Sequence, residues 1–288
     1  MNLATLVLPL ALAVIMFGLG LGLTVADFRR VLAHPKVSVI ALTCQVLLLP
    51  AICLLLVLLF DLPPVLAVGM MLLAASPGGT SANLYSHLFG GDVALNVTLT
   101  AINSVVSVFT LPLVANLALG HFMSGDGALG LQFDKSAQVF ALVLVPVAVG
   151  MLVRAKATAF AERMHRPVKI ASGVILAPVI IGAVVQSWDV ISAHLGDVGL
   201  AALSFSVISL AIGYGAPRLA GVGHPQAVAS CMEIGIHNAA LSITVATGIL
   251  GNPQMAVPSA AYGVVMFFTA AAAGFLLKTR QTRRISDK

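Results

Sequence analysis

The residues between Cys231 and Asn238 have the clearest capacity for chemistry in this chain. They include Glu233, one of two glutamates and the only acidic residue well inside an apolar segment, here roughly residues 227–250. A carboxylate near the middle of a bilayer costs about 2.5–3.5 kcal/mol on insertion scales. Another group must compensate that cost, so we expect Glu233 to serve the function of the protein. His237, four residues later, shares its helix face.

Sodium is one partner that would compensate Glu233, because hard cations take several oxygen ligands from carboxylates, amides, hydroxyls and carbonyls. Asn96 and Thr100 are four residues apart and share a helix face. An intramembrane Asn or Thr more often makes a helix–helix hydrogen bond than it ligates an ion, so Glu233 carries most of this expectation. The candidate ligands are the polar side chains that fall inside apolar segments: Gln45, Asn83, Asn96, Thr100, Glu233 and Asn238.

An organic anion is a second candidate partner. No Arg or Lys lies inside the core of an apolar segment. An anion would therefore rely on backbone N–H groups, hydroxyls and bound cations. A helix that begins near Gly79, Thr80 and Ser81 would present the positive end of its dipole to a carboxylate or a sulfonate.

An enzymatic function is not expected. Of the seven histidines, only His237 lies in the middle of an apolar segment. The sequence contains no helical zinc-protease motif, no Gly-x-Ser-x-Gly turn and no phosphate-binding loop. Glu233 and His237 would need at least a third ligand to hold zinc, and none has clear spacing. We expect no catalytic residues and no cofactor.

The elements that must position these residues are transmembrane helices. The chain is 59% hydrophobic and 9% charged, whereas soluble domains carry about 25% charged residues. Its apolar runs exceed the length of transmembrane strands, about 9–11 residues. Lipid offers no partners to backbone N–H and C=O groups, so an all-α bundle in the lipid bilayer follows. The basic residues sit in short loops and the tail rather than in a domain, which argues against nucleic-acid binding.

A helix crosses a bilayer in about 20 apolar residues, and on that basis the chain has nine spans. We expect a single transmembrane domain with four spans in residues 1–121, five in residues 136–277 and a basic cytoplasmic tail over 278–288. Residues 189–197 are expected to form an acidic link. The expected spans are 3–25, 37–60, 65–89, 93–119, 136–153, 170–188, 198–216, 227–250 and 255–277.

Basic residues lie almost entirely on one side of this arrangement. Fourteen of the fifteen Lys and Arg residues fall in alternate loops and the tail, and the opposite side carries only Lys135. The positive-inside rule then places the N-terminus outside and the C-terminus in the cytoplasm. We expect a multi-pass protein of the cell's inner (plasma) membrane.

Two spans contain residues that interrupt helices. Pro77-Gly78-Gly79 lies in the middle of span 65–89 and should free carbonyls on one side and N–H groups on the other. Gly235 lies between Glu233 and His237 at a similar depth in span 227–250. One interrupted span in each half is typical of transporters built from inverted repeats. Both interrupted spans are expected to run from outside to inside.

These stretches resemble the bile acid:sodium symporter family, including its bacterial members. The resemblance covers nearly the whole chain. It rests on Pro77–Asn83, Gly91–Thr100, Glu233–Asn238 and an early Phe17–Leu21 followed by Asp27-Phe28. It implies a core domain with two crossing broken helices and a panel domain, in a nine-span form that lacks the first helix.

The resemblance also implies two sodium sites. By position, one would use the side chains of Asn83, Asn96, Thr100 and Glu233 and the backbone of Ala82. The other would use Gln45, Glu233, the backbone of Ile234 and Ile236, and His237.

This chain departs from the family pattern at three places. Family members commonly have glutamine where this chain has His237, and serine where it has Ala82 or Asn96. Histidine is a poorer sodium ligand and titrates near neutral pH. Some bacterial relatives carry a His-Asn pair near the substrate where this chain has Met266 and Phe267, so the resemblance implies a different or less polar contact there.

The expected function is sodium-coupled symport of an organic anion, bile-acid-like or a small carboxylate, by alternating access. The anion is expected near Thr80, Ser81 and Asn238, with Met266 and Phe267 facing it from the last span. Sodium is the coupling ion. The alternative is a proton- or other cation-coupled carrier of organic anions in which Glu233 and His237 titrate.

Overall fold

The computed structural model describes residues 13–14, 16–18, 20–22, 34–123, 133–164, 167–168, 170–171, 174 and 188–286. These residues are helical apart from short connections, and within them the only β-type pairing is an isolated bridge between Gly78 and His237. Helical stretches long and apolar enough to cross a membrane cover Pro35–Leu59, Val93–Phe122, Gly196–Leu219 and Pro253–Lys278. The all-α class is confirmed, and the protein is a multi-pass membrane protein.

Residues 34–123 form one continuous helix, one interrupted helix and one long helix. The continuous helix comprises α3 (Pro35–Thr43), a π-helical turn η2 (Cys44–Leu48) and α4 (Leu49–Leu59). The interrupted helix comprises α5 (Pro64–Ala74) and α6 (Ser81–Leu88), and it is followed by α7 (Val93–Phe122). Local sequence sets these starts: Pro64 occupies the first turn of α5, and the Asp92 side chain caps α7 by accepting from Leu95 N.

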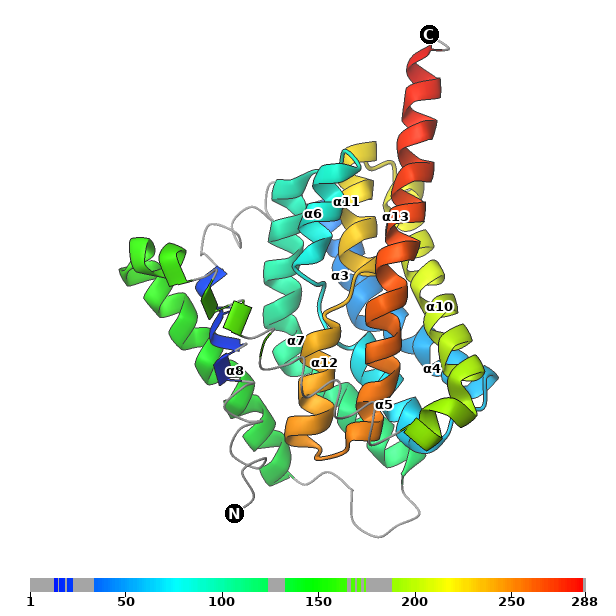
Figure 1. Cartoon of the computed structure of the whole chain (residues 1–288). Coiled ribbons are helices and arrows are strands. Elements are labelled where there is room, and N and C mark those ends of the chain that lie inside the picture. The colour runs from blue at the N-terminus through cyan, green and yellow to red at the C-terminus, as the bar shows by residue number, and fades with distance from the viewer. Residues whose placement is uncertain are drawn as a thin grey trace.

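The second half repeats this mixture. Helix α8 (Phe133–Lys156) precedes α10 (Trp188–Leu219), and α13 (Val257–Ser286) is the last helix. Between α10 and α13 lies an interrupted helix of α11 (His224–Gly235), α12 (Ala239–Thr244) and a π turn η3 (Val245–Ile249). A short 3-10 turn, η4 (Pro253–Ala256), leads into α13. Helix α13 continues beyond the bundle at the C-terminal end (Figure 1).

The predicted acidic link over 189–197 is wrong, because these residues form the first turns of α10. In the sequence, Ile191, Leu195 and Val198 recur at helical spacing, so the two aspartates of this stretch do not interrupt the pattern. The expected span 170–188 lies almost wholly outside the described residues. The expected span 255–277 lies within η4 and α13, whereas the expected span 3–25 and the tail over 278–288 are described only in part.

The two interrupted helices cross at their breaks near the middle of the bundle. Figure 1 shows α5 and α6 running from bottom to top, whereas α11 and α12 run from top to bottom. The Gly78–His237 bridge is accordingly antiparallel. The expectation that both spans run in the same direction is therefore wrong. Five crossings separate the third expected span from the eighth, and an odd number of crossings reverses direction.

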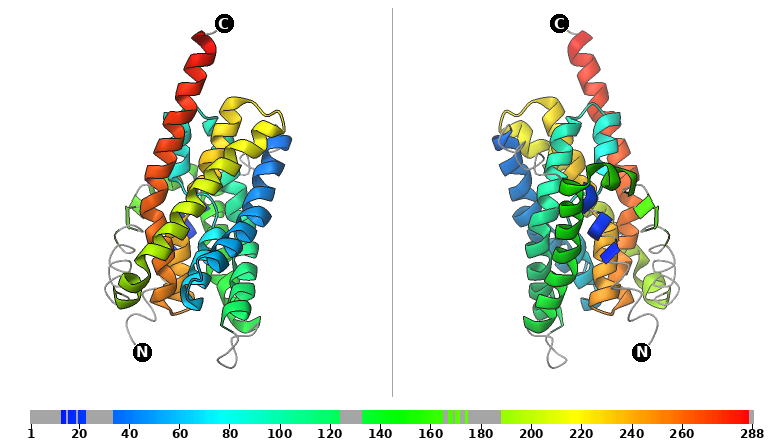
Figure 2. Two further views of the ribbon diagram at one scale, coloured as in Figure 1. Left: turned by 90° about the vertical axis from the view of Figure 1, so that its right-hand side faces the viewer. Right: turned by 90° about the vertical axis from the view of Figure 1, so that its left-hand side faces the viewer.

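Helix α8 lies on the α7 side of the bundle and carries the N-terminal helical residues on its surface (Figures 1 and 2). Small residues allow this contact. A Cβ built on Gly20 would lie 2.2 Å from the Val147 carbonyl oxygen, and one built on Gly150 would lie 2.4 Å from the Phe17 carbonyl oxygen. Backbones approach closely where glycines face each other, as membrane helices commonly do.

Candidate functional site

The crossing is held by two backbone hydrogen bonds between the broken segments. Gly79 N donates to Ile236 O at 2.6 Å, and Asn238 N donates to Pro77 O at 2.8 Å. Broken helices free backbone groups that would be costly in lipid, and here the two breaks satisfy some of each other's groups. The segments that Pro77-Gly78-Gly79 and Gly235 interrupt therefore support one another.

The absence of a side chain at Gly78 leaves the space that the Glu233 carboxylate occupies in the crossing. A Cβ built on Gly78 would lie 2.2 Å from Glu233 Oε1 and 2.5 Å from Oε2. Real Cβ atoms essentially never make such contacts, so only glycine fits here. The glycine therefore lets the side chain of one interrupted helix lie directly against the backbone of the other.

Glu233 is fully buried, and both of its carboxylate oxygens accept hydrogen bonds from α7. Thr100 Oγ1 donates to Oε2 at 2.5 Å, and Asn103 Nδ2 donates to Oε1 at 2.9 Å. Hydrogen bonds to a charged group are among the stronger ones, about 1.5–3 kcal/mol each. These two donors offset part of the cost of burying the carboxylate and fix its orientation.

Asn96 lies one turn before Thr100 and bonds the backbone of α11. Its Nδ2 donates to Ala229 O at 2.7 Å, one turn before Glu233. Residues 96, 100 and 103 follow helical spacing, so they line one face of α7 along α11. Asn96 and Thr100 share one face of α7, as predicted, but of the two only Thr100 bonds Glu233, whereas Asn96 bonds the backbone of α11.

Gln45 lies in the π turn η2 and reaches the other interrupted helix. Its Nε2 donates to Ser76 O at 2.9 Å, in the break between α5 and α6. π-helical turns are rare and are frequently found at functional sites. The structure thus brings Gln45 to the break, through Ser76 rather than through Glu233.

His237 lies in the break of the second interrupted helix and is 1% exposed. Its Nδ1 lies 3.1 Å from the hydroxyl of Tyr262 on α13, and that hydroxyl donates to Gly235 O at 2.9 Å. Glu233 and His237 do not share one helix face as expected, because α11 ends at Gly235.

Acceptor atoms without a hydrogen-bond partner gather around this crossing. Among the described residues, the unpartnered buried side-chain atoms include Gln45 Oε1, Asn83 Oδ1, Asn96 Oδ1, Asn103 Oδ1 and His237 Nε2. For Gln45, Asn96 and Asn103 the amide nitrogen faces a carbonyl or carboxylate, which can only accept, so the amide oxygen must face elsewhere. Buried polar atoms are normally satisfied, so such a group of acceptors requires explanation.

The remaining predicted ligands of the cation sites lie in or beside the two breaks. Ala82 and Asn83 lie in the first turn of α6, where Ala82 N donates to Gly79 O. Ile234 and Ile236 are fully buried, and the carbonyl of Ile236 already accepts from Gly79.

The predicted anion contacts lie at the helix starts after the breaks and on α13. Thr80 is exposed at the start of α6, whereas Ser81 is half-buried. Asn238 is also half-buried and caps α12, with its Oδ1 accepting from Leu241 N. On α13, Met266 is buried and Phe267 is partly exposed.

Two residues at the crossing were missed by the sequence analysis. Asn103 carried a usable signal, because it continues the face of Asn96 and Thr100 at helical spacing. Tyr262 carried none, since it lies on a different helix, 25 residues after His237. Only the tertiary packing of α13 reveals that contact.

Known proteins resemble this chain over most of its length. The “Sodium Bile acid symporter family” profile matches residues 9–194. “Probable sodium/metabolite cotransporter BASS1, chloroplastic” of Arabidopsis thaliana is 30% identical over 256 residues, 88% of this chain and 62% of the plant protein. “Uncharacterized sodium-dependent transporter YocS” of Bacillus subtilis is 28% identical over 96% of this chain and 83% of its own length.

The human “Ileal sodium/bile acid cotransporter” is 26% identical over 83% of this chain and 68% of its own length. The chain spans about three fifths of the length of the plant relatives that it matches. The family profile covers well over half of the chain, and the resemblance read from the two interrupted spans is confirmed. The chain therefore belongs to the sodium bile acid symporter family.

Proposed function

We propose that this chain is a secondary active transporter that couples sodium to the uptake of an organic anion. The observation that carries the proposal is the set of unpartnered acceptors around Glu233 at the crossing. A cation satisfies buried acceptor atoms, whereas an anion adds to their repulsion. The names of relatives, which mention sodium, support this choice of cation.

The acceptors divide into two groups, and we assign one sodium ion to each. The first ion would take Asn83, Asn96, Thr100 and Glu233, with the backbone of Ala82. Asn103 joins this group, since its amide holds Glu233 and its Oδ1 is unpartnered. The second ion would take Gln45, His237 and the backbone of Ile234 and Ile236, with Glu233 between the two groups.

Charge counting explains why sodium would recruit an anion. Glu233 is the only carboxylate at the crossing among the described residues, so one sodium ion neutralises it and a second leaves one net positive charge. A bound monoanion restores neutrality. Two sodium ions and one monoanion carry one net charge inward, which favours uptake by about 2.3 kcal/mol per 100 mV.

The substrate class follows from the residues near the breaks. Thr80 and Ser81 offer hydroxyl groups and Asn238 offers a side-chain amide for a carboxylate or sulfonate. Met266 and Phe267 on α13 are apolar, and Phe267 is 37% exposed. We propose a bile-acid-like anion or a small carboxylate that carries an apolar body next to its charged group.

The proposed architecture is a single transmembrane domain of nine spans in two inverted repeats, with four spans in the first. The α3–α7 and α10–α13 helices would form the core, and α8 with the N-terminal helix would form the panel. Rocking of the panel against the core would alternate access. The charge asymmetry supports a plasma-membrane protein whose N-terminus is outside and whose C-terminus is cytoplasmic.

The central test compares the only two glutamates. Glu233→Gln removes the buried charge, whereas Glu162→Gln alters a carboxylate that is 62% exposed and pairs with Arg154. In purified protein, we expect Glu233→Gln to abolish binding of ²²Na⁺ and Glu162→Gln to retain it. Unchanged sodium binding by Glu233→Gln would overturn the assignment.

The substrate test uses thermal unfolding with a panel of organic anions, in sodium chloride and in choline chloride. A true substrate should raise the Tm more when sodium is present, because the two ligands are linked. Uptake of that anion into proteoliposomes at several pH values then separates the coupling ions. Acid-driven uptake without sodium would favour the alternative carrier that titrates Glu233 and His237.

A further inference from the structure

The imidazole of His237 has one ring nitrogen with a partner and one without. Nδ1 lies 3.1 Å from the Tyr262 hydroxyl, and Nε2 is buried with no hydrogen-bond partner among the described residues. Because the two nitrogens of a neutral imidazole differ, one donating and one accepting, the partner of Nδ1 decides what Nε2 presents.

Counting protons at Tyr262 assigns the tautomer. The hydroxyl has one proton, and the carbonyl of Gly235 can only accept, so that proton is directed to Gly235 O at 2.9 Å. The contact with His237 then requires Nδ1 to carry the hydrogen and donate to the Tyr262 oxygen. A second hydrogen on Nε2 would place a charged ring in a buried position without an acceptor, which is costly. His237 is therefore neutral, with a bare lone pair on Nε2.

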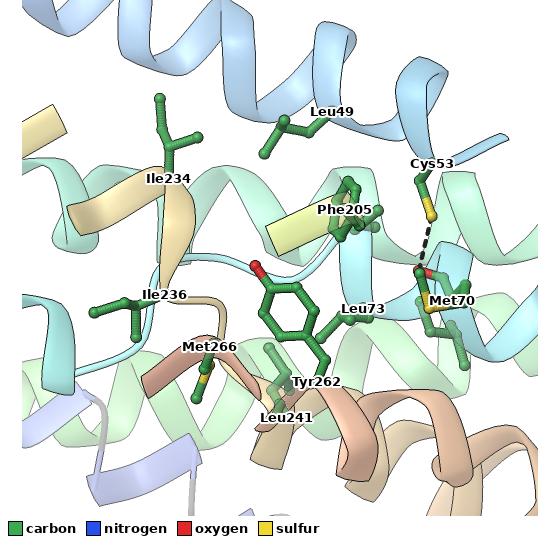
Figure 3. Packing of buried hydrophobic residues seen from close by; sticks show 14 of the residues in the cluster. Leu49, Cys53, Met70, Leu73, Phe205, Ile234, Ile236, Leu241, Tyr262 and Met266 are labelled. Atoms are coloured by element: carbon green, nitrogen blue, oxygen red, sulfur yellow. Dashed lines mark hydrogen bonds between the residues drawn. The ribbon is translucent and has the colours of Figure 1, made fainter. Parts of the chain in front are cut away.

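Packing holds both rings in this arrangement. Tyr262 is fully buried, and its ring is perpendicular to that of His237 at 5.3 Å between centroids. Phe205 of α10 contacts both rings, at 5.3 and 5.7 Å. Figure 3 shows the Tyr262 hydroxyl pointing toward the segment that carries Ile234 and Ile236, with Phe205 and Leu241 near its ring. The two supports, α10 and α13, are both continuous helices.

We propose that Tyr262 is a positioning residue for cation binding. It fixes the His237 tautomer so that the Nε2 lone pair, rather than an N–H group, faces the second cation site. The inference rests on the proposed function, because it takes sodium to bind at the crossing. Metal-binding histidines generally donate their other N–H to a fixed acceptor, and loss of that acceptor weakens metal binding about 10–100-fold.

A double-mutant cycle with ²²Na⁺ as the probe tests this role in the purified full-length protein. The proteins are the wild type, Tyr262→Phe, His237→Gln and the double variant. Tyr262→Phe removes only the hydroxyl. We expect it to weaken one of the two sodium sites about tenfold or more, because Nδ1 loses its acceptor and the ring can present N–H to the cation.

The His237→Gln background distinguishes a role of Tyr262 in fixing the His237 tautomer from a role in stabilising the surrounding structure. A glutamine oxygen accepts without any choice of tautomer, so Tyr262→Phe should then change sodium affinity less than about threefold. A merely structural role, acting through Gly235 O, predicts the same loss on both backgrounds. Equal losses, or no loss in Tyr262→Phe alone, would overturn the proposal.

A spectroscopic measurement reports the protonation of the two His237 ring nitrogens directly, independently of any effect of the variants on stability. In ¹⁵N-histidine spectra, the His237 signals are those missing from His237→Gln. We expect a protonated Nδ1 and an unprotonated Nε2, with Nε2 shifting when choline chloride is exchanged for sodium chloride. A protonated Nε2 in the wild type contradicts the inference.

Failure of this inference is distinguishable from failure of the proposed function. If the wild type binds no ²²Na⁺, both fall. If it binds sodium in a Glu233-dependent manner while the cycle is additive, only the role of Tyr262 falls. Thermal unfolding of Tyr262→Phe, which should remain a single transition, checks that the variant is folded.

Discussion

The crossing has a carboxylate side, formed by Glu233, Thr100 and Asn103, and an imidazole side, formed by His237 and Tyr262. The second sodium site that we propose adds Gln45 to the imidazole side. On the carboxylate side, both oxygens of a charged group accept from α7. On the imidazole side, the ring that we infer to be neutral bonds α13 through Nδ1, and its Nε2 has no partner among the described residues. A charge attracts a cation over a distance, whereas a lone pair acts only at contact. The first side should therefore respond most to loss of charge, and the second to small changes of geometry.

Gly78→Ala should have the largest effect, because it disturbs both sides together. Its Cβ would overlap the Glu233 carboxylate and displace the backbone that bridges to His237. We expect a loss of about 1–3 kcal/mol or more in unfolding free energy and no measurable ²²Na⁺ binding. Gly215→Ala is the control, since a Cβ at Gly215 would meet no neighbouring atom within 4 Å among the described residues. Normal binding by Gly78→Ala would show that the close approach is not required.

Thr100→Val tests the carboxylate side alone. It keeps the shape of the side chain and removes the hydroxyl that donates to Glu233 Oε2. Losing a hydrogen bond to a charged group costs about 1.5–3 kcal/mol, or roughly 10- to 100-fold in sodium affinity. Thr98→Val is the matched control, because in the described part of the chain Thr98 Oγ1 bonds within its own helix, at Ala94 O. Equal effects in both variants would count against a role for Thr100 in the site.

Asn103→Leu tests whether Asn103, which was not predicted from the sequence, contributes to sodium binding as the predicted residues are expected to do. The change removes the donor to Glu233 Oε1 and one unpartnered acceptor. We expect sodium affinity to fall about 10-fold, measured by ²²Na⁺ titration. Ser107→Ala serves as control, since Ser107 donates within α7 to Ser104 O. An affinity equal to the wild type would remove Asn103 from the first group.

Gln45→Leu should have the smallest effect on total binding, because we assign Gln45 to the second proposed sodium site alone. It removes the bond to Ser76 O and the acceptor Oε1. We expect the number of bound sodium ions per chain to fall from two toward one, while the remaining site keeps its affinity. Gln226→Leu is the control, since Gln226 contacts His34 away from the crossing. Loss of both ions would mean that the two sides are not separable.

Sequence reasoning located the crossing because its causes are local. Pro77, Gly78 and Gly79 break a helix wherever they occur, and a lone Glu233 in an apolar span demands compensation. The partners of these residues were harder to predict, because a contact such as that of Tyr262 depends on how α13 packs. The prediction of a link over residues 189–197 failed for another reason. The two aspartates indicated a loop, although apolar residues continue at helical spacing through this stretch.

The π turn η2 has a consequence for how this site is encoded. Before it, α3 contacts α7 and α11; after it, α4 contacts α5; both helices contact α10. A π-helical turn contains one residue more than an α-helical turn. Each residue of an α-helix rotates the chain by about 100° around the helix axis. Deleting Leu47, which is 66% exposed, would keep every polar residue and nearly the same composition, yet it would rotate α4 relative to α3. At this position the geometry of the site depends on the number of residues in the helix as much as on the identity of its side chains.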